Sequence, residues 1–154
     1  MIVLCNANAV DTTLAYLREA GTRNCEGIVL WLGRRTANAI HVEAVYRPAH
    51  VASEDMFHIP PASMTALQAE LRQKRLMVAA QVHSHPMEAF HSKADDRWAI
   101  IRHEGALSLV VPYFASKTTT ATFIKDAKAY QFSSDAKWEL VPSQEVSRLW
   151  LQIK

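Results

Sequence analysis

The spacing of apolar and polar residues predicts a succession of strands separated by helices. Short apolar runs at Ile2–Cys5 and Leu107–Val111 are typical of buried strands, and Ala39–Tyr46 alternates as a half-buried strand does. Another apolar run covers residues 26–33, opened by Glu26 and closed by a glycine. Residues 34–38 then form a turn, so the strands on either side of it are expected to make an early hairpin.

Four segments are predicted to be helical. The first contains Val10, Leu14 and Leu17, with Asp11 or Thr12 as its N-cap and Gly21 as its stop. The second covers residues 62–74, and a third follows Ser92 and ends near residues 103–105. The fourth opens at Pro142-Ser143, and one face of it presents four apolar residues: Val146, Leu149, Trp150 and Ile153.

The remaining strands complete the predicted fold. An apolar run at residues 76–80 is typical of a buried strand, and a short strand is expected at residues 56–59. Residues 121–125 and Lys128–Phe132 are expected to pair as a hairpin, followed by a strand at residues 138–141. The order predicts one α/β domain covering residues 1–154, with a central mixed sheet flanked by helices.

Composition narrows the class of protein. The chain is 49% hydrophobic and 21% charged, as is usual for a globular domain. A net charge of +2 gives no reason to expect a nucleic-acid partner. No apolar run approaches the roughly 20 residues that cross a membrane. Two cysteines far apart make no disulfide framework, and the start lacks a signal peptide's basic region, so we expect a cytoplasmic protein.

The residues with the most chemical potential lie between Gln81 and Trp98. His83 and His85 end an apolar run, and alternate residues of a strand share a face, with Cα atoms about 6.5 Å apart. Pro86 then ends the strand. Ser92 opens a helix-like segment whose first turn contains Asp95, and the intervening loop is long enough to bring that carboxylate beside the imidazoles. Two imidazoles and a carboxylate suit zinc, with the fourth position left for water.

Structural interpretations of the same residues stay open. Ser92 and Asp95 also fit a helix-capping box, and a pair of strand-end histidines is often structural. Asp96 is the competing ligand, but one residue turns it about 100° around a helix relative to its neighbour. Phe90 and His91, in the loop after the strand, are weak candidates for substrate contact.

The combined pattern resembles a known family. His-Ser-His-Pro followed by Ser-x-x-Asp is similar to the motif of the JAMM (MPN+, JAB/Mov34-like) metalloproteases. The strand that begins at Glu26 and ends with Gly33 matches that family's upstream glutamate strand. Its inner glycine falls at Gly27, and the interval from His85 to Ser92 is one residue shorter than in the common eukaryotic motif. Loop lengths vary among the bacterial members, so the chain resembles a bacterial JAB protein.

The resemblance implies a cytidine-deaminase-like MPN/JAB fold and one catalytic zinc ion. His83, His85 and Asp95 would bind the metal, Glu26 would activate water as general base, and Ser92 would donate a hydrogen bond to the developing oxyanion. The implied reaction is cleavage after the C-terminal tail of a ubiquitin-like protein, either to deconjugate it or to mature its precursor. Further similarity, over about residues 23–113, is to bacterial JAB proteins linked with ubiquitin-activating and conjugating enzymes in antiphage operons of the Bil and CBASS kinds.

Two other functions remain to be separated from this one. The same site would also serve to release cysteine or another small amine from a sulfur-carrier protein. A non-enzymatic MPN scaffold is the alternative outside catalysis, and it is disfavoured because all five site residues are present.

Overall fold

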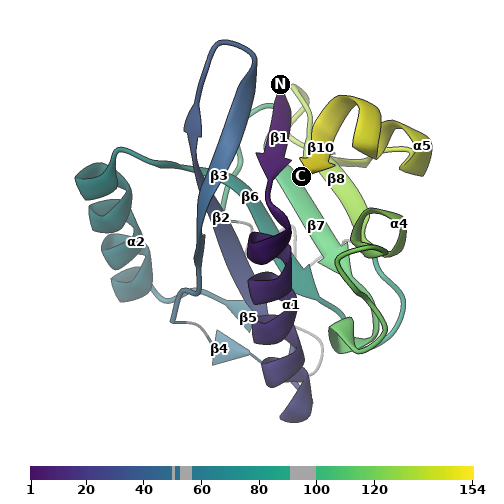
Figure 1. Ribbon diagram of the computed structural model, residues 1–154. Helices are drawn as coiled ribbons and strands as arrows, with labels where there is room; N and C mark the ends of the chain where they lie inside the picture. The colour runs from purple at the N-terminus through teal and green to yellow at the C-terminus, as the bar shows by residue number, and fades with distance from the viewer. Residues whose placement is uncertain (50, 53–56, 91–99) are drawn as a thin grey trace.

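The computed structural model describes residues 1–49, 51–52, 57–90 and 100–154. Within them, eight strands form one mixed sheet in the order β10-β1-β3-β2-β6-β7-β8-β9, and β4 pairs separately with β5 (Figure 1). The strands are β1 Ile2–Cys5, β2 Ile28–Arg35, β3 Ala39–Tyr46, β4 Val51–Ala52, β5 Phe57–His58, β6 Met77–Ser84, β7 Leu107–Val111, β8 Lys128–Phe132, β9 Trp138–Leu140 and β10 Leu151–Ile153. The helical elements are α1 Ala7–Thr22, α2 Pro61–Lys74, η1 Tyr113–Ala115, α4 Phe123–Asp126, α5 Ser143–Glu145 and η2 Val146–Trp150.

The predicted α/β class with a mixed central sheet is confirmed. β1 runs parallel to β3 and β10, and β6 runs parallel to β7, whereas the β2–β3, β2–β6, β7–β8 and β8–β9 pairs are antiparallel. Strands β1, β3 and β7 occupy the predicted residues, and α2 starts one residue earlier than expected. No helix among the described residues is long and apolar enough to span a membrane.

β2 lies at the centre of the sheet and is buried on both faces. Val29 and Trp31 belong to the apolar cluster that includes the buried face of α1, whereas Leu30 and Leu32 belong to the cluster that includes Leu67 of α2. Figure 1 shows α1 packed across one side of the sheet and α2 well apart from α1, at the left of the view. Because both faces of β2 are covered, its sequence is continuously apolar rather than alternating.

The limits of α1 differ from the prediction. Asn6 is the N-cap, and its Oδ1 accepts a hydrogen bond of 2.8 Å from Ala9 N, so Asp11 and Thr12 lie inside the helix. Gly21 does not stop the helix, which continues to Thr22. A Cβ at Gly21 would lie 2.6 Å from Cβ of Phe114, so this glycine permits close packing instead.

Further predictions of secondary structure were wrong in whole or in part. Residues 121–125 do not form a strand, because Phe123 starts the short helix α4 and packs its ring 5.8 Å from the buried ring of Trp31. The predicted helix after Ser92 does not include residues 100–106, and the rest of it lies outside the described residues.

The C-terminal helix breaks into α5, the π-helical turn η2 and β10. β10 pairs in parallel with β1, so Ile153 lies opposite Cys5 in the sheet and not on a helix face. This pairing satisfies the backbone of β1 along an edge that a helix would leave open.

Gly33 lies inside β2, which continues to Arg35, and so it does not close the strand as predicted. The register of β2 on β3 shifts between Leu32 and Gly33, and a Cβ at this glycine would lie 2.5 Å from the backbone oxygen of His41. The shift therefore brings two backbones together where only hydrogen fits.

Replacing Gly33 by alanine is expected to destabilise the fold by about 1–3 kcal/mol, because the β3 backbone must move to admit the methyl group. Urea unfolding measures this free energy. The control is Asn38→Ala in the exposed turn of the same hairpin, which should change it by less than about 0.5 kcal/mol. Equal midpoints for the two variants would contradict the close approach.

Candidate functional site

The site begins where β2 starts and β6 ends. Ile28 pairs with His83 in the antiparallel ladder, and the same register continued outward places Gly27 opposite Ser84 and Glu26 opposite His85. Ser84 N donates to Gly27 O at 3.0 Å, and Gly27 N donates to Ser84 Oγ at 2.9 Å, so the register holds beyond the strand ends. The serine between the histidines therefore fixes the residue after Glu26.

Glu26, His83 and His85 are all buried, with exposures of 1%, 0% and 2%. The centroids of the two imidazole rings are 5.2 Å apart, and Glu26 Oε1 lies 3.6 Å from His85 Nε2. The structure thus brings three of the five predicted site residues together. Burying a carboxylate beside two imidazoles costs free energy unless opposite charges or hydrogen bonds compensate these groups. Such a buried polar cluster is typical of a functional site.

The chain after His85 is fixed to the end of β7. His85 N donates to Val111 O at 2.9 Å, and Phe114 N donates back to His85 O at 2.8 Å. The three residues of η1 have φ values of 55°, 51° and 61°, a left-handed conformation that costs energy in residues other than glycine. This strained turn supplies the amide that holds His85.

Of the other predicted site residues, the structure describes Phe90 but not His91, Ser92 or Asp95. Phe90 is 52% exposed, and its ring meets that of His85 edge to face at a centroid distance of 4.6 Å. Ser92 and Asp95 lie outside the described residues, as do His91 and the competing Asp96. The short strand expected at residues 56–59 is partly described, as β5.

The described residues alone do not form a complete metal site. Within residues 1–49, 51–52, 57–90 and 100–154, no group of three His, Cys, Asp or Glu side chains is placed to hold an ion. The two adjacent imidazoles are nevertheless ligands that zinc prefers, and a carboxylate from residues 91–99 would complete the set of three. The donor types therefore fit zinc.

One buried polar residue near the site was not anticipated from the sequence. Gln81 Nε2 donates to Ser108 Oγ at 3.0 Å, and Gln81 Oε1 accepts from Ile100 N at 3.0 Å. Gln81 precedes the histidines by two and four residues, so it shares their face of β6. The signal in the sequence is a polar amide directly after the apolar run of residues 76–80.

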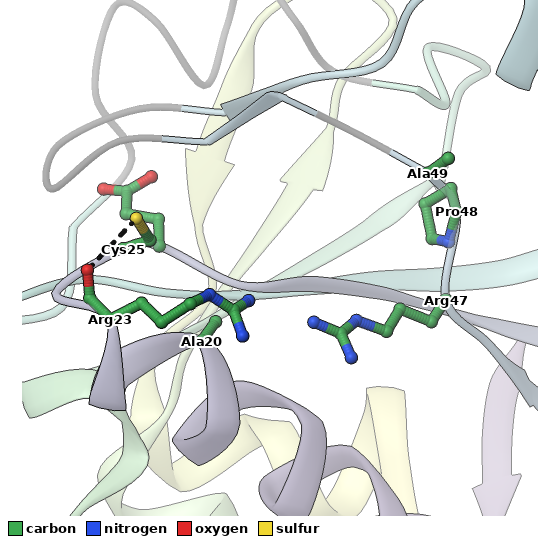
Figure 2. A pocket seen from close by; sticks show the side chains of 7 residues that line it. Ala20, Arg23, Cys25, Arg47, Pro48 and Ala49 are labelled. Carbon is green, nitrogen blue, oxygen red and sulfur yellow. Dashed lines mark hydrogen bonds between the residues drawn. The ribbon is translucent and has the colours of Figure 1, made fainter.

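Glu26 also lines a cleft of about 530 Å³, shown from close by in Figure 2. Its other lining residues come from the end of α1, the segment before β2 and the segment after β3: Ala20, Arg23, Cys25, Arg47, Pro48 and Ala49. The buried carboxylate therefore adjoins a space large enough for part of a substrate.

Solved structures share the fold. The solution structure of protein DSY2949 from Desulfitobacterium hafniense superposes with a TM-score of 0.72 at 21% identity, covering 100% of this chain and 93% of that one. The solution structure of a protein from Salinibacter ruber (strain DSM 13855) gives a TM-score of 0.58 at 17% identity, covering 92% and 89%. At these identities the likeness shows the fold alone.

Sequence comparison shows the family. A curated protein of Sinorhizobium fredii (strain NBRC 101917 / NGR234), named "Probable metalloprotease y4jG", is 33% identical over 146 residues, which are 92% of this chain and 88% of that protein. The family described as prokaryotic homologs of the JAB domain matches residues 6–122, the part of the chain that contains Glu26, His83 and His85. The chain therefore belongs to the prokaryotic homologs of the JAB domain.

Proposed function

We propose that this protein is a zinc-dependent peptidase of the JAMM type. The observation that carries the proposal is the buried Glu26 carboxylate, 3.6 Å from His85 and opposite it across the β2–β6 register. Membership of the JAB family supports the same activity, as does the similarity to a protein named as a probable metalloprotease.

His83, His85 and Asp95 would hold the metal in this proposal. When bound, zinc supplies Lewis-acid activation of water and of the substrate carbonyl. Glu26 takes the proton from the attacking water and delivers it to the departing amine. Because this carboxylate is buried, little bulk solvent competes for the proton. Ser92 would donate a hydrogen bond to the oxygen on which negative charge develops.

The proposed substrate is a ubiquitin-like protein, cut after its extended C-terminal tail. Met87, Phe90 and Tyr113 are large apolar residues that remain exposed close to His85, and Tyr113 N donates to Met87 O at 2.8 Å, so these two lie side by side. Exposed apolar side chains beside a buried polar site suit contact with the apolar residues of an extended peptide. The proposed partners are enzymes of the ubiquitin-activating and ubiquitin-conjugating types, encoded in the same operon as part of an antiphage system of the Bil or CBASS kind.

The test is a ubiquitin-like protein fused through its tail to a reporter. Glu26→Gln should retain zinc but lower kcat/KM by about 10²–10⁴, because the amide cannot accept the proton. Cleavage is followed by mass spectrometry, with zinc measured in both proteins. A variant that keeps full activity, or one that loses its zinc, would contradict the role of Glu26 as base.

A parallel assay with a carrier–cysteine adduct separates this activity from amine release by a sulfur-carrier hydrolase. Faster turnover of the adduct than of the protein fusion would favour the sulfur-carrier function. Cleavage of the fusion alone would favour the proposed one.

The choice between the two adjacent aspartates has its own prediction. Asp95→Ala should weaken zinc binding at least about tenfold in competition with a chelating dye, because it removes a charged ligand. Asp96→Ala is the matched control and should leave the zinc affinity close to that of the wild type. The reverse order would move the ligand by one residue.

A further inference from the structure

Two arginines from different elements flank the cleft beside Glu26. Arg23 is the C-cap residue of α1, and Arg47 immediately follows β3. Figure 2 shows their guanidinium groups pointing toward each other within the lining of the cleft. We propose that Arg23 and Arg47 form a subsite that binds a carboxylate of the substrate close to the bond that is cut.

The two guanidinium groups are held in place by one acid. Arg23 Nη1 contacts Glu19 Oε1, and Arg47 Nη2 contacts Glu19 Oε2 at 2.6 Å. Hydrogen bonds from Arg23 and then Arg47 lower the pKa of the Glu19 carboxyl below its usual value. The Arg47 guanidinium also lies 5.3 Å from the ring centroid of Tyr16. These contacts, already made in the free protein, reduce the side-chain ordering that binding requires.

The charges of Arg23, Arg47 and Glu19 do not cancel, so an anion in addition to Glu19 can bind there. Two guanidinium groups share the single negative charge of Glu19, so one positive charge remains among the three groups. Each guanidinium has five N–H donors, of which the carboxylate of Glu19 uses only part. The C-terminal end of α1 also favours positive charge at Arg23. Glu26 would repel a carboxylate placed beside it, so the bound acid belongs at the arginine end of the cleft.

The class of ligand follows from the proposed function, on which this inference rests. Paired arginines recognise carboxylates and phosphates, and a peptidase substrate offers the former. The carboxylate has two possible sources, an Asp or Glu side chain of the substrate or the terminal carboxylate of a short leaving group. With the carboxylate from either source bound at the arginines, the peptide backbone of the substrate would lie on the side of the cleft that contains Glu26.

Cys25 provides a test that needs neither metal nor turnover. It lines the same cleft and is partly exposed, and its Sγ donates to Arg23 O at 3.4 Å. The other cysteine, Cys5, is buried, which raises the pKa of its thiol to about 12, so it reacts slowly. Alkylation of the chain by small iodo reagents should therefore occur at Cys25.

Iodoacetate and iodoacetamide compare a carboxylate with a neutral amide. In both reactions the Cys25 thiolate forms an S–C bond and iodide leaves. We expect the ratio of the two rates, taken relative to the urea-unfolded chain, to favour iodoacetate by about tenfold, because the arginines bind its carboxylate. Mass spectrometry of the Cys25 peptide measures both rates. The same iodoacetate-to-iodoacetamide ratio in the folded and the unfolded chain would overturn the subsite.

The variants make the assignment specific. Arg23→Gln with Arg47→Gln should remove the preference for iodoacetate, while reaction with iodoacetamide checks that the cleft remains accessible. Arg34→Gln with Arg35→Gln is the matched control, because it also removes two positive charges, and both arginines are exposed and do not line the cleft. Loss of the preference in this control as well would mean that total charge, and not the subsite, is responsible.

Cleavage assays then identify the source of the carboxylate. Paired reporters would differ by Glu against Gln near the cut bond, or by a free against an amidated C-terminus. The wild type should prefer one acidic member by about tenfold, and the double variant should not. A preference in alkylation without any cleavage would sustain the subsite and contradict the proposed function. Cleavage without a preference for the acidic reporter or for iodoacetate would support the proposed function and contradict the subsite.

Discussion

The antiparallel register of β2 on β6 is the constraint on which the candidate site depends. It places Glu26 opposite His85, although neither residue belongs to the ladder itself. The register is strongly specified because β2 is buried on both faces, where a one-residue slip would exchange the side chains packed against α1 and α2. The paired bonds between Gly27 and Ser84 carry this alignment to the site.

The site is built from groups that a stable core would exclude. A carboxylate and two imidazoles are buried together, and the neighbouring turn η1 is held in a left-handed conformation. Both features oppose folding. The apolar clusters on the two faces of the sheet offset that cost, and Gln81 ties β6 to β7 and to the backbone at Ile100. Local rules of stability are broken where function is proposed, as expected.

The sequence predicts the elements whose pattern is locally decisive. β3 and β7 match because their apolar periodicity has one interpretation. Glu26, His83 and His85 are candidates because their spacing resembles a family motif, and the structure places them near one another. Predictions failed where tertiary contacts decide, as for Phe123, which packs in a helix against Trp31, and Ile153, which pairs with Cys5 in the sheet. The cleft arginines, 24 positions apart, come together only through the packing of α1 against the β3 end, so no local pattern indicates them.

The most direct test of the central claim is the zinc content of the purified protein, compared with that of a His83→Asn, His85→Asn double variant. Mass spectrometry under native conditions measures both, and the unfolding midpoint of each shows that it is folded. The account predicts one zinc ion per wild-type chain and none in the variant, because the adjacent imidazoles supply two of three ligands. Equal zinc in the two folded proteins, or none in the wild type after incubation with zinc, would contradict it.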